Sequence, residues 1–253
     1  MKKQLHIFFT AVMFYTRIPC PAWVNHDAEY LNKATRYFPL IGWLVGGAAA
    51  VLFILCNYLF TTPVAILISM VGTILITGAF HEDGFADVCD GFGGGWTKEK
   101  ILLIMKDSRV GAYGVIGTVL LLLLKFTSLA AIDTAMLWKV LIAAHSFSRL
   151  CPVLMIATSQ YVRENEDAKA KPLAKSITAA EIVPALVFGI TPLALLGSFN
   201  VLIIIIAPLI GTWWLRHYFH KWIGGYTGDC LGSIQQVTEL LFYLSTITLW
   251  KFI

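Results

Sequence analysis

Residues 80–95 read FHEDGFADVCDGFGGG and directly follow a long apolar run. If that run continues as a helix, Asp83, Asp87 and Asp90 lie at i, i+4 and i+7, so three carboxylates share one face. Like charges at this spacing repel one another, and Mg2+, which prefers oxygen ligands, is the expected partner. Glycines at 91 and 93–95 then end the helix and leave backbone N–H groups open to a phosphate. The stretch therefore predicts a Mg2+-dependent phosphotransferase site.

The composition is that of an integral membrane protein. The chain has 253 residues, of which 58% are hydrophobic and 13% charged, and its mean hydropathy is +0.74. A soluble domain carries about 25% charged residues. No polar linker is long enough to separate two domains, so residues 1–253 are predicted to form one membrane domain. The net charge of +4 comes from basic residues in short loops, which indicates membrane topology and not nucleic-acid binding.

Seven apolar runs are long enough to cross a bilayer, and they predict an all-α bundle of about seven transmembrane helices. The runs cover residues 39–60, 63–80, 110–132, 135–158, 182–198, 201–215 and 237–253. Residues 5–16 form a shorter apolar segment after Lys2 and Lys3, with no small-residue cleavage site behind it. We expect this segment to be an interfacial or re-entrant helix, because it is too short to span comfortably.

Basic residues divide unequally between the two predicted faces. Fifteen Lys and Arg residues fall within residues 1–38, 81–109, 159–181 and 216–236, whereas the opposite face has Lys251 alone. By the positive-inside rule the long loops, and with them the acidic stretch, face the cytosol. The N-terminus is then inside and the C-terminus outside.

Glycines occur at spacings that are typical of helix contacts in lipid. Gly42 and Gly46 form a GxxxG pattern, and Gly111, Gly114 and Gly117 open the run at 110–132. Small residues let membrane helices approach closely. We therefore expect both groups to be packing surfaces.

Asp107 offers a fourth carboxylate. It lies 17 positions after Asp90, and the loop between them is long enough to fold it back beside the first three acids. Four carboxylates could hold two metal ions, which clamp the entering and leaving oxygens of a displacement at phosphorus. The alternative is a simple ion pair between Asp107 and Arg109 at the membrane edge.

Four arginines are candidates for binding phosphate, because the guanidinium fork matches phosphate oxygens. They are Arg17, Arg36, Arg109 and Arg149. Arg17 and Arg36 have an alternative role as topology charges. Arg149 lies within a predicted span, where a buried arginine usually has either a function or an ion-pair partner.

Residues 224–232 read GGYTGDCLG and form a third polar segment. Thr227 and the glycines could wrap a phosphate or a sugar, and Asp229 could bind a hydroxyl or assist with a metal. Glu239 follows near the start of the last apolar run. On spacing alone this evidence is weak, because loops near membranes are often glycine-rich. His81 adjoins the acids and could orient a ligand or act as a base.

Taken together, these motifs resemble the cobalamin synthase family, also called adenosylcobinamide-GDP ribazoletransferases or cobalamin-5'-phosphate synthases. The likeness covers nearly the whole chain, in the family's order. It consists of Arg17-Ile18-Pro19, Phe38-Pro39-Leu40-Ile41-Gly42, His81-x-Asp83-Gly84-x-Ala86-Asp87-x-x-Asp90-Gly91, Met105-Lys106-Asp107-Ser108-Arg109-x-Gly111 and Gly224-Gly225-x-Thr227-Gly228-Asp229. Any one motif would be weak evidence, whereas all five in order on a polytopic chain are strong evidence.

The resemblance implies the last step of corrinoid assembly in the bacterial inner membrane. Adenosylcobinamide-GDP and α-ribazole, or α-ribazole 5'-phosphate, are the implied substrates, and Mg2+ is the implied cofactor. The 5'-hydroxyl of the ribazole attacks the phosphate attached to the cobinamide, and GMP leaves. The lipid bilayer is the remaining expected partner, and a homo-oligomer is compatible with the sequence.

The resemblance also implies roles for individual residues. The metal ligands carried over from it are Asp83, Asp87, Asp90 and Asp107. The catalytic candidates are Asp83, Asp87, Asp90 and His81, and either a carboxylate or His81 takes the proton of the attacking hydroxyl. The substrate-binding candidates are Arg17, Arg36, Arg109, Arg149, Thr227, Asp229 and Glu239. Glu82 differs from the apolar residue that some family members have at this position. We therefore expect Glu82 to contact the metal ligands and not the metal itself.

Two other functions compete with this interpretation. Asp87-x-x-Asp90-Gly91 fits the opening of the CDP-alcohol phosphatidyltransferase signature, but the following Ala-Arg pair and the later paired aspartates are missing. A transporter would bury its acids near the middle of the bilayer on broken helices. Here the acids cluster at a predicted cytoplasmic edge, which favours an enzyme.

Overall fold

The computed structural model describes residues 2–24, 28–163, 176–197 and 201–252. Within these ranges every regular element is a helix, and the one β-type pairing is an isolated bridge between Tyr161 and Tyr226. Residues 198–200, at the junction of the runs predicted at 182–198 and 201–215, and the basic residues Lys169, Lys171 and Lys175 lie outside the described residues. The elements are α1 (Lys2–Tyr15), α2 (Ala28–Ala34), η1 (Thr35–Tyr37), α3 (Phe38–Leu59), α4 (Thr62–Thr77), α5 (Phe80–Gly94), α6 (Lys98–Ile104), α7 (Ala112–Ala130), α8 (Thr134–Thr158), α9 (Ala179–Ile190), η3 (Thr191–Leu196), α10 (Val201–Ile204), α11 (Ile206–Ile223) and α12 (Gly228–Phe252).

In the described chain, five helical segments are long and apolar enough to span a membrane. They are Glu29–Leu59, Ala112–Ala130, Thr134–Thr158, Ala179–Leu196 and Val201–Ile223. α4 and α5 qualify together as a sixth, bent by 88° at a short break. The all-α polytopic bundle is therefore confirmed, with five or six spans where the sequence predicted about seven. The run predicted at 237–253 lies in α12, whose polar side chains, Glu239 among them, lower its hydropathy.

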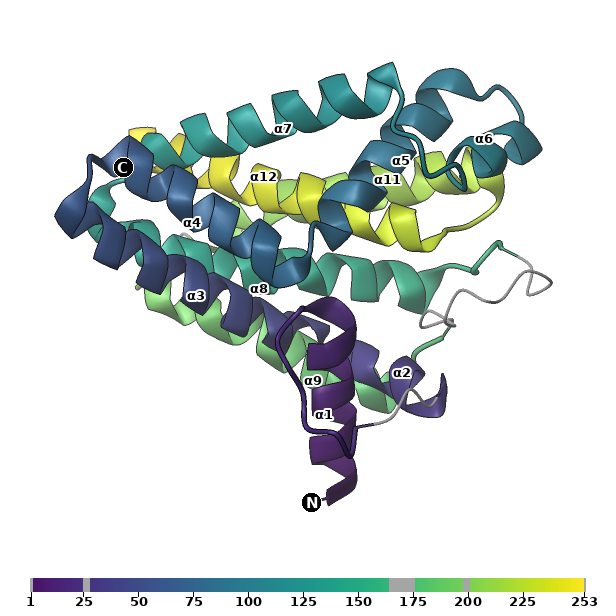
Figure 1. Cartoon of the computed structure of the whole chain (residues 1–253), viewed down its shortest axis with the longest axis horizontal. Helices are drawn as coiled ribbons and strands as arrows, with labels where there is room; N and C mark the ends of the chain where they lie inside the picture. The colour runs from purple at the N-terminus through teal and green to yellow at the C-terminus, as the bar shows by residue number, and fades with distance from the viewer. Residues whose placement is uncertain (1, 25–27, 164–175, 198–200, 253) are drawn as a thin grey trace.

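The long helices run side by side, and their connections gather at the two ends of the bundle (Figure 1). One end holds the tight turns from α3 to α4 and from α7 to α8, together with the C-terminus. The other end holds α6, the end of α8 and the connection from α11 to α12. This arrangement agrees with the predicted grouping of the longer, basic loops on one face.

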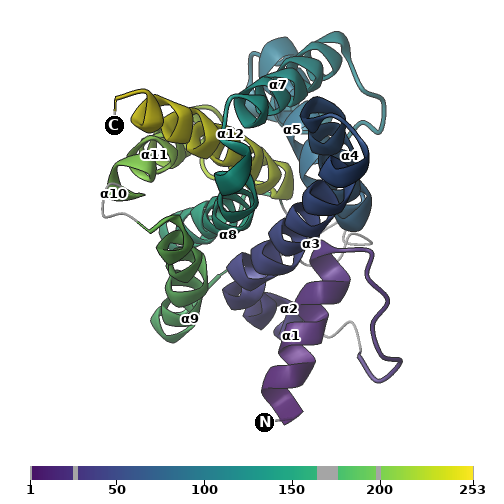
Figure 2. The same cartoon turned by 90° about the vertical axis from the view of Figure 1, so that its left-hand side faces the viewer.

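α8 is the central helix of the bundle, as Figure 2 shows. It packs against α3, α9, α11 and α12, and sixteen of its 25 residues are buried, so most of its circumference is covered by protein. The outer helices instead expose large apolar side chains, such as Leu55 on α3, Leu75 on α4 and Ile116 on α7. A helical bundle with an apolar outer surface fits a lipid environment.

The predicted glycine contacts are confirmed on α3. A Cβ atom at Gly42 would lie 2.3 Å from the carbonyl oxygen of His145, and one at Gly46 would lie 2.8 Å from that of Leu141. Both carbonyls belong to α8, so the GxxxG pattern sets the closest approach of α3 to the central helix. Gly47, one position along, has open space where its Cβ would be.

α1 runs across the direction of the bundle helices (Figure 1). Its 14 residues span about 21 Å at 1.5 Å per residue, which is shorter than a hydrocarbon core of about 30 Å. Its buried face includes Ile7, Ala11 and Val12. The structure is thus compatible with the interfacial or re-entrant helix that the sequence predicts, which stays a prediction.

The chain bends sharply between α4 and α5, so the acidic stretch begins a new helix and does not continue the apolar run. Gly78 and Ala79 both adopt left-handed backbone conformations, with φ of 67° and 57°. A Cβ atom at Gly78 would lie 2.1 Å from the Nε of Arg17, whose backbone N–H donates to the carbonyl oxygen of Ile76. The segment after α1 therefore packs onto the bend that directs α5.

Replacing Gly42 with alanine tests the contact between α3 and α8. We expect Gly42→Ala to lower the free energy of unfolding by about 1–3 kcal/mol, because the added methyl group overpacks a backbone contact that cannot give way. Gly47→Ala is the matched control, since its methyl group enters open space. Denaturation of the two purified variants in the same detergent measures the difference. Equal stabilities would contradict the contact.

Candidate active site at the edge of the bundle

Asp83 and Asp87 lie one turn apart on α5, with Asp83 exposed and Asp87 half-buried. α5 packs closely on the first turns of α12, because Gly84 and Gly232 have no side chain at the contact. A Cβ atom at Gly84 would lie 3.0 Å from the Cα of Asp229. This packing brings Asp229 within electrostatic range of both α5 carboxylates. We call Asp83, Asp87 and Asp229 the acidic edge.

Arg163 is the basic side chain that acts on the acidic edge. Its Nη2 donates to Asp229 Oδ2 at 2.8 Å and to the carbonyl oxygen of Met105 at 3.2 Å. The Arg163 and Asp229 side chains are 31% and 20% exposed, so the pair remains accessible from solvent. Burial raises the pKa of Asp229, and the nearby Arg163 guanidinium opposes that shift. The guanidinium of Arg163 therefore pairs with Asp229 and lies within electrostatic range of Asp87.

Arg163 reaches this position through a backbone pairing between two distant segments. The N–H of Tyr226 donates to Gln160 O, and the N–H of Val162 donates to Tyr226 O, both at 3.0 Å. A Cβ atom at Gly225 would lie 2.2 Å from the Gln160 oxygen, so the pairing requires glycine there. From the sequence alone, Arg163 is only one of the basic residues of the 159–181 loop that indicate membrane topology. Its role depends on a contact between residues more than 60 positions apart, which no local pattern reveals.

Thr227 has a structural position at the start of α12. Its hydroxyl accepts from the N–H of Cys230 at 3.4 Å and donates to Asp229 Oδ2 at 3.3 Å. The residue is fully buried. Thr227 thus caps the helix and orients Asp229. Its predicted contact with substrate stays a prediction.

Asp90 lies on α5 but is engaged by another helix. Its two carboxylate oxygens accept from the backbone N–H of Gly111 at 2.6 Å and of Gly114 at 2.8 Å. Cβ atoms at these two glycines would lie 2.5 Å and 2.4 Å from Asp90 oxygens, which confirms the predicted close packing of the α7 start. A carboxylate at a helix N-terminus is stabilised by the free amides and the helix dipole. Asp90 therefore holds α7 against α5.

Asp107 pairs with Arg109, the alternative considered from the sequence. Arg109 Nη2 donates to Asp107 Oδ2 at 2.7 Å, and Nε donates to Oδ1 at 3.0 Å. These hydrogen bonds lower the pKa of Asp107 to about 2. The Arg109 side chain is 87% exposed, so the pair lies at the surface.

The structure thus separates the four carboxylates predicted as metal ligands. Asp83 and Asp87 share one face, Asp90 is engaged by α7, and Asp107 is paired with Arg109. In the part of the chain that the structure describes, no three His, Cys, Asp or Glu side chains are grouped closely enough to hold a metal. Asp229, predicted from the third polar segment, joins the first two instead.

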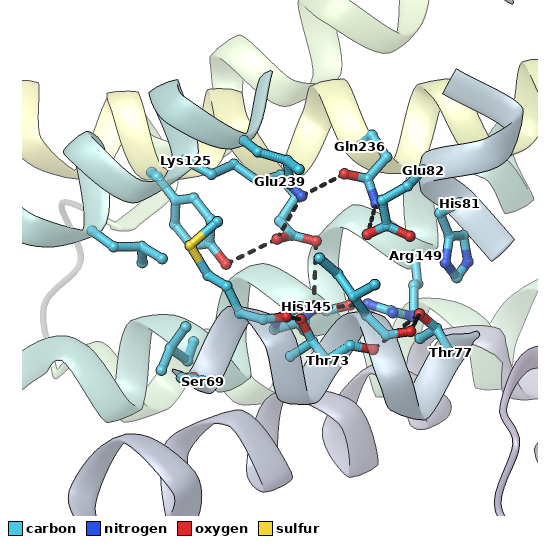
Figure 3. A pocket seen from close by; sticks show the side chains of 16 residues that line it. Ser69, Thr73, Thr77, His81, Glu82, Lys125, His145, Arg149, Gln236 and Glu239 are labelled. Atoms are coloured by element: carbon cyan, nitrogen blue, oxygen red, sulfur yellow. Dashed lines mark hydrogen bonds and ion pairs between the residues drawn. The ribbon is translucent and has the colours of Figure 1, made fainter. Parts of the chain in front are cut away.

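Arg149 and Glu239 lie inside the bundle, in a polar cluster that Figure 3 shows. Arg149 is 1% exposed, and its Nη1 donates to the carbonyl oxygen of His145 at 2.9 Å. Glu239 accepts from Lys125 at 2.9 Å and from Gln235 at 2.6 Å. Their predicted role in binding substrate stays a prediction. Sequence reasoning did not identify the glutamine, although a polar residue in an apolar helix is itself a signal.

The remaining predicted residues lie around the N-terminal segment. Arg17 is exposed at the α4–α5 bend, and Arg36 donates from Nε to the Lys33 carbonyl oxygen at 3.0 Å. His81 is 2% exposed and stacks on Phe38, with ring centroids 5.6 Å apart. It lines the interior cavity, so it is separated from the solvent-facing acids of α5.

Comparisons with known proteins agree with the motifs. The family model for cobalamin-5-phosphate synthase matches residues 7–247. An adenosylcobinamide-GDP ribazoletransferase of Shewanella pealeana is 44% identical over 251 residues, covering 98% of this chain and 97% of the relative. One of Ralstonia pickettii is 45% identical over 244 residues, covering 95% of this chain and 94% of the relative.

No solved structure matches this chain. The family model and the relatives each cover almost its whole length, and the motifs that carry the resemblance lie within that coverage. The chain therefore belongs to the cobalamin-5-phosphate synthase family.

Proposed function

We propose that the chain transfers the adenosylcobinamide phosphate group of adenosylcobinamide-GDP to the 5'-hydroxyl of α-ribazole, or of α-ribazole 5'-phosphate, with release of GMP. The names of the relatives support the substrates. The observation that carries the proposal is the acidic edge of Asp83, Asp87 and Asp229, with Arg163 hydrogen-bonded to Asp229 and within electrostatic range of Asp87. A transfer at phosphorus asks a protein mainly for positioning and for compensation of charge.

The residues present fit a Mg2+ ion. Asp83 and Asp87 have no ion pair with any described residue, and their oxygens are the ligand type that Mg2+ prefers. Mg2+ is commonly held by one or two carboxylates together with substrate phosphates, so a preformed cage is not required. We assign these two residues as its ligands, with Asp229 beside them. When bound, the ion neutralises charge on the diphosphate and the leaving GMP.

Arg163 is proposed to bind the diphosphate. Its Nη2 is engaged by Asp229 and Met105, but its Nε and Nη1 have no partner among the described residues. Two free donors on a guanidinium match two oxygens of a phosphate. Arg109 and Arg17, both exposed, stay candidates for contacts farther from the reacting phosphate.

The proton of the attacking hydroxyl is proposed to go to a carboxylate oxygen of the acidic edge. His81, the alternative base, is buried and faces the interior cavity. Asp90 is proposed to act through position, by holding α7 beside the site.

We also propose that the protein resides in the bacterial inner membrane with the acidic edge facing the cytosol. The apolar spans support a membrane location. The excess of Lys and Arg on the connections at this end supports the orientation.

Neutralising the proposed Mg2+ ligands should stop turnover. We expect Asp83→Asn and Asp87→Asn each to lower the rate of GMP release by about 100-fold or more, because charge compensation is lost where the phosphate reacts. Glu99→Gln, on exposed α6, is the matched control and should keep the parent rate. Chelation by EDTA should stop the parent enzyme and added Mg2+ should restore it. A folded Asp87→Asn protein with the parent rate would overturn the assignment.

Replacing Arg163 should weaken substrate binding. We expect Arg163→Ala to raise the KM for adenosylcobinamide-GDP by about 10- to 100-fold, the value of a charge-assisted hydrogen bond pair. Arg163→Lys should restore little of the lost affinity for adenosylcobinamide-GDP, because an ammonium group cannot reproduce the two parallel hydrogen bonds of a guanidinium. Lys100→Ala, which removes an exposed charge on α6, is the control for a general electrostatic effect. An unchanged KM in Arg163→Ala would show that the arginine serves only Asp229.

A further inference from the structure

A small cavity lies inside the bundle, lined by residues of α4, α5, α7, α8 and α12. Its polar lining is drawn in Figure 3, where Glu82, His81 and Arg149 lie together at one end and Lys125 lies at the other. The internal space is about 20 Å³. A cavity needs roughly 10–15 Å³ to hold a water molecule, so this one has room for a water and not for a phosphate or a nucleotide.

Three side-chain atoms that line this cavity are buried without a hydrogen-bond partner among the described residues. They are His81 Nε2, Glu82 Oε2 and Arg149 Nε. Leaving a buried polar atom unpaired carries a large free-energy penalty. Three such atoms at one end of one polar cavity indicate that something occupies it.

The charges around the cavity show what kind of occupant fits. Lys125 and Glu239 form a direct ion pair at 2.9 Å. Arg149 and Glu82 attract each other, but no ion pair within 4.0 Å joins them among the described residues. The four charges sum to zero, so a further ion would leave an uncompensated charge inside the bundle. The occupant should therefore be neutral, and able both to accept and to donate hydrogen bonds.

We propose that the cavity binds one water molecule, which bridges Arg149 and Glu82 and makes their attraction a water-mediated ion pair. The Arg149 Nε–H donates to the water oxygen. The water donates one hydrogen to Glu82 Oε2 and the other to His81 Nε2, with the imidazole neutral. This arrangement satisfies all three unpaired atoms at once, and buried waters typically make about three hydrogen bonds.

The site connects the central helix to the first turn of α5. Arg149 belongs to α8, while His81 and Glu82 immediately precede Asp83. The side-chain amide Nε2 of Gln236, on α12, also donates to Glu82 Oε1 at 2.9 Å. The bound water thus completes the contacts that fix the start of the helix carrying Asp83 and Asp87. This inference does not depend on the proposed reaction.

Radiolytic hydroxyl labelling, read by mass spectrometry on the whole detergent-purified chain, tests the site directly. Radicals formed from a bound water modify the side chains beside it even where bulk solvent cannot reach. His81, which is 2% exposed, should be modified. Met155 on α8 is the internal control: it is fully buried, it does not line the cavity, and it should stay unmodified. Modification of His81 no greater than that of Met155 would overturn the proposal.

A second measurement tests whether Arg149 and Glu82 act together. Arg149→Met and Glu82→Met should each lower the unfolding midpoint. The double variant should lower it by less than the sum of the two single losses, because each single change leaves the other charge buried without its partner. Arg109→Met with Glu82→Met is the control and should be additive, since Arg109 is exposed. In Arg149→Met the His81 modification should be lost. Additive losses for Arg149 and Glu82 would contradict the bridge.

Discussion

The close glycine contact between α5 and α12 determines the relative positions of the three carboxylates of the acidic edge. With no side chain at Gly84 and Gly232, the backbones approach until Asp229 lies beside Asp83 and Asp87. Any side chain at Gly84 would meet the backbone of Asp229 itself. Repulsion between the three carboxylates works against this approach, and Arg163 offsets only part of it. The close contact therefore holds like charges together, an unfavourable arrangement that the proposed Mg2+ ion would relieve.

The interior polar cluster explains how such an arrangement is held in a largely apolar bundle. Hydrogen bonds join α7 to α12: Lys125 on α7 donates to Gln236 and Glu239 on α12, and Gln235 also donates to Glu239. Gln236 in turn donates to Glu82 at the start of α5. Hydrogen bonds between buried charged groups are strong where water is excluded, but each unpaired group is costly. The cluster thus fixes the orientation of α5 from inside, while the glycine contact fixes its distance from α12.

Much of the fold was predictable from the sequence, because it depends on local composition. The apolar runs, the GxxxG contact of Gly42 and Gly46 with α8, and the shared face of Asp83 and Asp87 all follow from spacing along one helix. What could not be predicted depends on distant contacts. Asp90 shares the spacing of the other acids, yet its oxygens are taken by α7. Arg163 reaches Asp229 only through the Tyr161–Tyr226 bridge.

The rate of GMP release by Gly84→Ala shows whether the close contact between α5 and α12 assembles the site. The added methyl group must push α5 away from Asp229, whereas Gly94→Ala on the same helix meets only an ordinary contact at 3.4 Å. We expect Gly84→Ala to lower the rate about 10- to 100-fold, because small displacements of catalytic groups are costly. Gly94→Ala should keep a rate near the parent value. A folded Gly84→Ala protein that releases GMP at the parent rate would contradict the claim that this contact assembles the site.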